Sequence, residues 1–87
     1  MNKKQQEILD ILQEECAEVI QAVSKVRRFG EDSNKASLIE ELADLQCMID
    51  LCYEFDILNG DDELDFEDRI KVKRSKLKVF SSIFKEE

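Results

Sequence analysis

The chain has 87 residues, enough for one small domain with little hydrophobic core, so a partner or a bound metal is expected to add stability. Its net charge of −8 argues against a nucleic-acid polymer as a partner. The absence of histidine excludes Ser-His and Cys-His catalysis, and it leaves oxygen or thiolate ligands for any metal.

The N-terminus does not resemble a signal peptide, and no apolar run approaches the roughly 18 residues of a membrane span. Three cysteines, Cys16, Cys47 and Cys52, are interpreted as small core or boundary residues in a reducing compartment. We therefore expect a cytoplasmic protein with no membrane contact.

Residues 3–28 predict one long helix, because good helix formers occur throughout and apolar side chains recur at helical spacing. On a helical wheel Glu15 lies in the middle of the apolar face, Glu18 lies towards its edge and Glu14 lies just outside it. Gly30 is expected to cap this helix. The last turns carry basic residues that suit the negative end of the helix dipole, namely Lys25, Arg27 and Arg28.

A second helix is predicted at about residues 35–57, with Asn59-Gly60 as its stop signal. Ser37 and Glu40 have the spacing of a capping box at its start. An earlier start at residues 32–33 is the alternative.

The apolar face of this second helix contains Glu41, and Asp44 lies at its border. Two helices therefore each direct a pair of carboxylates towards the interior. Buried carboxylates without partners shift their pKa, find a cation or bind a metal. A hard divalent cation is the simplest solution, with Mg²⁺ expected and Mn²⁺ as a substitute. In the alternative interpretation both helices are slightly rotated, and the acids lie at a solvated edge.

The last third of the chain begins acidic and becomes basic, which matches the dipole of a third helix. Its expected apolar face collects Phe66, Ile70, Leu77, Phe80 and Phe84. Lys73 falls inside that face and Lys76 falls on its margin. Either they serve a site or they bury their stems and extend their amines into water.

These patterns predict an all-α fold with three main helices in a single domain, residues 1–87. The first two helices are expected to form a hairpin that completes a four-helix bundle with a second chain. A homodimer or a higher even-numbered oligomer is therefore expected.

Three segments carry a family resemblance. Glu14-Glu15-x-x-Glu18 followed by Glu41-x-x-Asp44, within the longer runs 14–30 and 40–50, resembles the MazG-like all-α nucleoside triphosphate pyrophosphohydrolases. The two runs resemble the short single-domain members common in bacteriophages, and a phage-encoded protein would act in the host cytoplasm. The closing Ile70-x-x-Lys73-x-x-Lys76-Leu77 is similar to the last helix of that group.

The resemblance implies Mg²⁺-dependent hydrolysis of a (deoxy)nucleoside triphosphate between the α and β phosphates. It implies that the metal ligands are Glu15, Glu18, Glu41 and Asp44. Glu14 would orient the attacking water or act as the base, unless it is only a solvated surface acid. Phosphate contacts would come from Lys73 and Lys76, with Lys25 and Arg28 as further candidates. Phe29, Tyr53 and Phe55 are the aromatic candidates for stacking on the base.

Two other functions remain open at this point. One is a non-catalytic helical dimerisation module whose inward carboxylates pair with Lys73 and Arg74. The other is a carboxylate-bundle metalloprotein with a redox or storage role, against which the absence of histidine argues.

Overall fold

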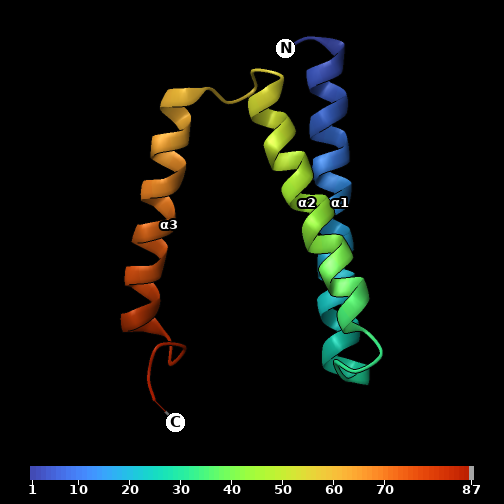
Figure 1. Cartoon of the computed structure of the whole chain (residues 1–87), viewed down its shortest axis with the longest axis vertical. Helices are drawn as coiled ribbons and strands as arrows, with labels where there is room; N and C mark the ends of the chain where they lie inside the picture. Colours follow the sequence, from blue (N-terminus) through green and yellow to red (C-terminus); the bar gives the residue numbers. More distant parts are fainter. Residues whose placement is uncertain (87) are drawn as a thin grey trace. The chain divides into compact units, whose positions relative to one another are not determined.

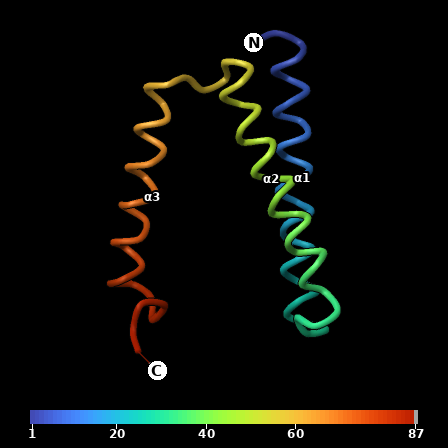
Figure 2. Tube along the Cα trace, in the orientation of Figure 1, coloured from blue at the N-terminus to red at the C-terminus, as the bar shows by residue number. Residues whose placement is uncertain are grey.

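The computed structural model describes residues 1–86, which form three α-helices and no strand (Figures 1 and 2). α1 spans Lys3–Phe29, α2 spans Lys35–Glu54 and α3 spans Gly60–Phe80. The predicted all-α class with three helices is confirmed. The chain divides into two compact units, Met1–Ile57 and a second unit that starts at Leu58.

Both ends of α1 are capped by the residues that flank it. The Asn2 side chain accepts a hydrogen bond from the Gln5 backbone N–H at 2.8 Å, and the Gln5 side chain accepts one from the Asn2 N–H at 3.0 Å. At the other end the Gly30 N–H donates to the Val26 carbonyl at 2.9 Å. Gly30 has a φ of 90°, which side chains disfavour, so the predicted cap at this glycine is confirmed.

α2 starts at Lys35, as predicted, but its capping differs from the prediction. Asn34 precedes the helix, and its side chain makes no capping bond to α2; its amide donates to the Gly30 carbonyl at 3.0 Å. The predicted capping box of Ser37 and Glu40 is wrong, because both residues lie inside the helix.

The end of α2 also differs, since the helix stops at Glu54 rather than near residue 57. Asp56 takes a φ of 62°, and the Gln5 amide of α1 donates to the Phe55 carbonyl at 3.0 Å. Asn59 was expected to stop α2 but caps α3 instead, because its side chain accepts hydrogen bonds from the backbone N–H groups of the next turn.

α1 and α2 run side by side in opposite directions within the first unit (Figure 1). The hairpin buries only Ile8, Ala22, Met48 and Cys52. Several large apolar side chains of the hairpin stay exposed, among them Ile20, Val23, Ile39 and Leu42. So small a core agrees with the expectation that another chain covers part of this surface. The four-helix bundle with a second protomer stays a prediction.

The three cysteines form no disulfide with one another and differ in their surroundings. Cys52 lies in the hairpin core, where loss of hydration raises the pKa of its thiol. Cys16 and Cys47 are exposed, so the expected core or boundary position holds for Cys52 alone.

The second unit contains α3, none of whose residues is buried within the single chain. Three acids occupy its first turn and Lys78 its last, as the dipole pattern predicted. The predicted apolar face does not extend to Phe84, because α3 ends at Phe80 and the Ser81 hydroxyl donates to the Leu77 carbonyl at 2.7 Å. The Phe84 ring lies instead under the guanidinium of Arg74, 4.9 Å from its centroid.

In the described part of the chain, each helix is too short or too polar to cross a lipid bilayer.

Candidate metal centre

The antiparallel pairing of α1 and α2 brings together acids from both halves of the sequence motif. Glu15, Glu41 and Asp44 each offer a carboxylate oxygen, and these three oxygens all lie within 4.8 Å of one another. Glu15 and Glu41 are half-buried between the helices, and Asp44 is exposed. We refer to Glu15, Glu41 and Asp44 as the acid cluster.

Glu15 has one carboxylate oxygen that is buried without a hydrogen-bond partner. Its Oε2 atom is buried, yet no group among the described residues donates a hydrogen bond to it. A buried carboxylate oxygen without a donor carries the full cost of its lost hydration. A cation bound in the acid cluster would supply the missing positive charge.

The electrostatics of Glu41 lead to the same requirement. Loss of hydration between the helices raises the pKa of Glu41 above its ordinary value of 4.5. Repulsion from Glu18, Glu15, Asp44 and Glu40 raises it further, in that order. The fold therefore makes ionisation of Glu41 less favourable than in water, and a divalent cation would offset that penalty.

The other two acids of the first motif lie further out. Glu18 is exposed and contributes none of the three converging oxygens, although its carboxylate is close enough to repel that of Glu41. Glu14 is exposed and lines an open depression of α1 together with Asp10, Gln13 and Ala17. The three converging acids form a candidate metal site. Ligand roles for the four predicted acids, and a catalytic role for Glu14, remain proposals.

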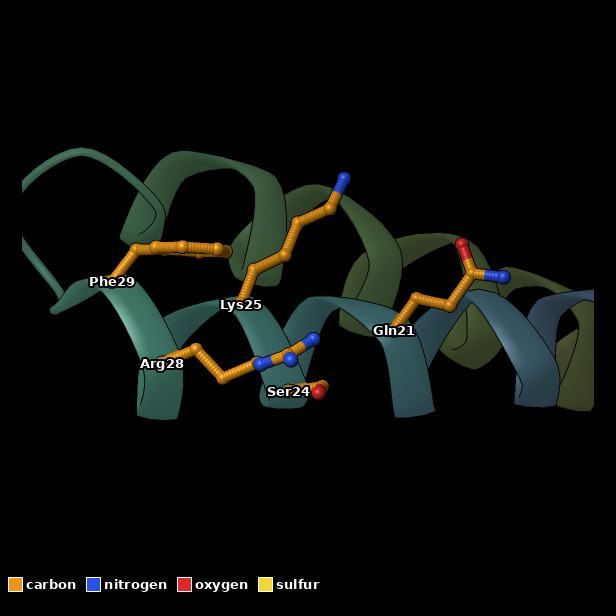
Figure 3. A pocket seen from close by; sticks show the side chains of 5 residues that line it. All are labelled: Gln21, Ser24, Lys25, Arg28 and Phe29. Atoms are coloured by element: carbon orange, nitrogen blue, oxygen red, sulfur yellow. The ribbon is translucent and has the colours of Figure 1, made fainter.

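The predicted phosphate-binding residues fall into two groups. Lys73 and Lys76 are exposed on α3. Lys25 and Arg28 line a pocket near the C-terminal end of α1, shared with Gln21, Ser24 and Phe29 (Figure 3). We call these five residues the α1 pocket.

Sequence reasoning did not single out Gln21 and Ser24 as part of a site. Their spacing carried a signal, because Gln21 precedes Lys25 by four residues and Ser24 precedes Arg28 by four, so each neutral residue lies beside a cation on the helix surface. Gln21 and Ser24 are neutral, so the pattern of charges that revealed the acids of α1 did not mark them.

A helical hairpin that gathers carboxylates from two i,i+3 pairs belongs to the class of all-α domains suited to divalent cations. The family comparison identifies it further: the model of the MazG nucleotide pyrophosphohydrolase domain matches residues 3–79, and the chain belongs to this family. That membership indicates nucleotide pyrophosphohydrolase chemistry in general terms. No curated protein and no solved structure matches the chain significantly.

Proposed function

We propose that the protein hydrolyses a (deoxy)nucleoside triphosphate between the α and β phosphates in a Mg²⁺-dependent reaction. The observation that carries this proposal is the meeting of three carboxylate oxygens within 4.8 Å, one of them from Glu15, whose Oε2 atom is buried without a donor. Membership of the MazG family supplies the class of reaction.

Glu15, Glu41 and Asp44 would hold the metal, with Glu18 as a fourth ligand after a change of its side-chain rotamer. When bound, Mg²⁺, or Mn²⁺ in its place, would neutralise phosphate charge and promote ionisation of a water molecule. The oxygen of that water bonds to the α phosphorus while the bond from this phosphorus to the bridging oxygen breaks. The monophosphate and pyrophosphate are the products, and the water proton passes to a base.

Glu14 is the proposed base or water-positioning residue, since it is exposed one residue before a proposed ligand. Lys73 and Lys76 would contact phosphate oxygens as point charges, and Lys25 and Arg28 are further candidates for phosphate contacts. The small hairpin core and the exposed apolar side chains support a homodimer or a higher even-numbered oligomer, in which a site shared between chains becomes feasible.

The test is to incubate the protein with each dNTP in Mg²⁺ or in excess chelator and to separate the products by anion exchange. A monophosphate and pyrophosphate formed only with Mg²⁺ are expected. Glu41→Gln should abolish this activity, whereas Glu54→Gln, the same change at an exposed position of α2, should preserve it. Wild-type protein that consumes no triphosphate would favour the non-catalytic dimerisation module. A diphosphate product would contradict the proposed bond cleavage.

A further inference from the structure

Gln5 links the start of α1 to the end of α2, which lie side by side (Figure 1). Its side-chain oxygen accepts a hydrogen bond from the Asn2 N–H at 3.0 Å and completes the capping box of α1. Its side-chain nitrogen donates to the Phe55 carbonyl at 3.0 Å. Glutamate would complete a capping box equally well, but an ionised carboxylate has no proton to donate. The amide at this position therefore does more than cap α1.

The Phe55 carbonyl belongs to a tightly closed helix end. Asp56 has a φ of 62°, and the Ile57 N–H turns back to donate to the Cys52 carbonyl at 2.9 Å. This is the bond of a Schellman motif, which satisfies a carbonyl that has no partner within the helix. Gln5 satisfies the Phe55 carbonyl at the same helix end. The last turn of α2 is thus held to the first turn of α1.

The middle of the hairpin resists a slip of one helix along the other only weakly. Glu15 and Glu41 are half-buried there and repel each other while no cation is bound. The buried apolar residues of the hairpin are few, namely Ile8, Ala22, Met48 and Cys52. The connection between residues 29 and 35 closes one end of the hairpin. At the other end, contacts between α1 and α2 must fix how the two helices are aligned.

The bond from Gln5 is placed to set the level at which the acids meet. Glu15 follows Gln5 by ten residues, which is about 15 Å along α1 at 1.5 Å per residue. Asp44 precedes Phe55 by eleven residues, or about 17 Å along α2, so the two acids come level. A slip by one helical turn, about 5.4 Å, exceeds the 4.8 Å within which the three oxygens of the acid cluster lie.

We propose that Gln5 is a positioning residue: its bond to the Phe55 carbonyl fixes the register of α1 against α2 and so assembles the acid cluster. We call this bond the Gln5 clasp. Its importance for the reaction rests on the proposed function. The clasp acts through the backbone of α2 and touches neither metal nor substrate. Without it, fewer chains are in the metal-binding register, and the apparent metal affinity falls with that fraction.

Gln5→Glu removes the clasp and keeps the cap. Glutamate still accepts the hydrogen bond from Asn2, and its negative charge suits the first turn of a helix, so the protein should stay folded. Gln6→Glu is the matched control. The Gln6 amide donates to the Met1 carbonyl at 3.2 Å, at the same end of α1, and the substitution adds the same charge one residue further on.

Spin labels on the exposed Cys16 of α1 and Cys47 of α2 report the register in metal-free protein. Cys52 is buried, and mass spectrometry verifies that a brief reaction leaves it unlabelled. Excess unlabelled protein ensures that pulsed electron paramagnetic resonance measures distances within one chain. Wild type and Gln6→Glu should give one narrow distance distribution, whereas Gln5→Glu should give a broader one or a second distance. An unchanged distribution in Gln5→Glu would overturn the clasp.

Mn²⁺ binding to unlabelled protein, followed by the resonance of the free ion, tests the positioning role. Gln5→Glu should bind Mn²⁺ about 2- to 13-fold more weakly than wild type, the factor that one neutral hydrogen bond contributes, and Gln6→Glu should bind it normally. Altered distances with unchanged Mn²⁺ affinity would show that the clasp does not position the acid cluster. Wild-type protein that consumes no triphosphate would refute the proposed function, yet altered distances and weaker Mn²⁺ binding in Gln5→Glu would still uphold the clasp.

Discussion

Replacing Glu41 by glutamine should remove the stabilisation that Mg²⁺ provides without destabilising the metal-free protein. Glutamine keeps the shape of the side chain and removes its charge. In the metal-free fold that charge is less favourable than in water, because lost hydration and four neighbouring acids raise the Glu41 pKa. The substitution therefore removes repulsion while it takes away one of the three converging oxygens.

The size of the metal response follows from binding linkage. A ligand present at 100 times its Kd that binds only the folded state stabilises that state by about 2.7 kcal/mol. For a domain of this size each kcal/mol shifts Tm by roughly 4–8 °C, so the wild-type Tm should rise by roughly 10–20 °C. If losing one ligand weakens Mg²⁺ binding about 100-fold, the same Mg²⁺ concentration stabilises the variant by only about 0.4 kcal/mol, or roughly 2–3 °C.

Thermal unfolding followed by circular dichroism, in Mg²⁺ and in EDTA, measures both quantities. In EDTA the Glu41→Gln protein should unfold at the wild-type temperature or above it. Glu54→Gln, which removes an exposed acid from the same helix, should keep the full Mg²⁺ response. A Glu41→Gln protein that gains as much from Mg²⁺ as wild type would place Glu41 outside the metal site.

Four further outcomes are expected. A carboxyl group whose pKa is raised by folding stabilises the folded state most at pH values below its unfolded-state pKa. Urea unfolding without metal should therefore show a contribution to the free energy of unfolding that falls as pH rises above 4.5. Glu41→Gln should lack this pH-dependent contribution. Glu15→Gln and Asp44→Asn should each lower kcat by orders of magnitude, and the double variant little further; additive losses would show that the two acids act independently. Lys73→Ala should reduce turnover but keep Mg²⁺ binding without nucleotide, and full activity would refute its phosphate role. Light scattering should show a dimer or a larger even-numbered oligomer, whereas a folded monomer of 10.2 kDa at micromolar concentration would contradict it.

The acid cluster was predictable because helical periodicity determines which side chains share a face. Glu15 and Glu41 were placed inside their apolar faces, and both are half-buried; Asp44 was placed at a border and is exposed. Antiparallel pairing of two helices joined by a short connection then brings the two motifs to the same level. Glu18 is exposed, as a position towards the edge of the face implies, so its rotamer is set by solvent rather than by packing.

The helix ends were less predictable, because several residues compete to cap them and contacts far apart in sequence decide the outcome. Asn59-Gly60 resembles a stop signal, yet Asn59 caps the next helix. α2 stops earlier, where Gln5, fifty residues away, donates to the Phe55 carbonyl. Phe84 lies at helical spacing from Phe80, but α3 ends before it and its ring contacts Arg74. Periodicity identifies faces, whereas such hydrogen bonds and ring contacts determine where a helix ends.

The charges of the hairpin also imply an order of binding. A polyphosphate that approaches the metal-free acid cluster meets three converging carboxylates and is repelled. The cations of the α1 pocket, Lys25 and Arg28, attract the same ligand, but they lie several turns from the carboxylates on a surface open to water, where screening weakens their effect. A bound divalent ion reverses the sign of the interaction at the acid cluster and relieves the repulsion that raises the Glu41 pKa. If the proposed function holds, metal and nucleotide should therefore favour each other's binding, and the protein should bind the pair better than either ligand alone.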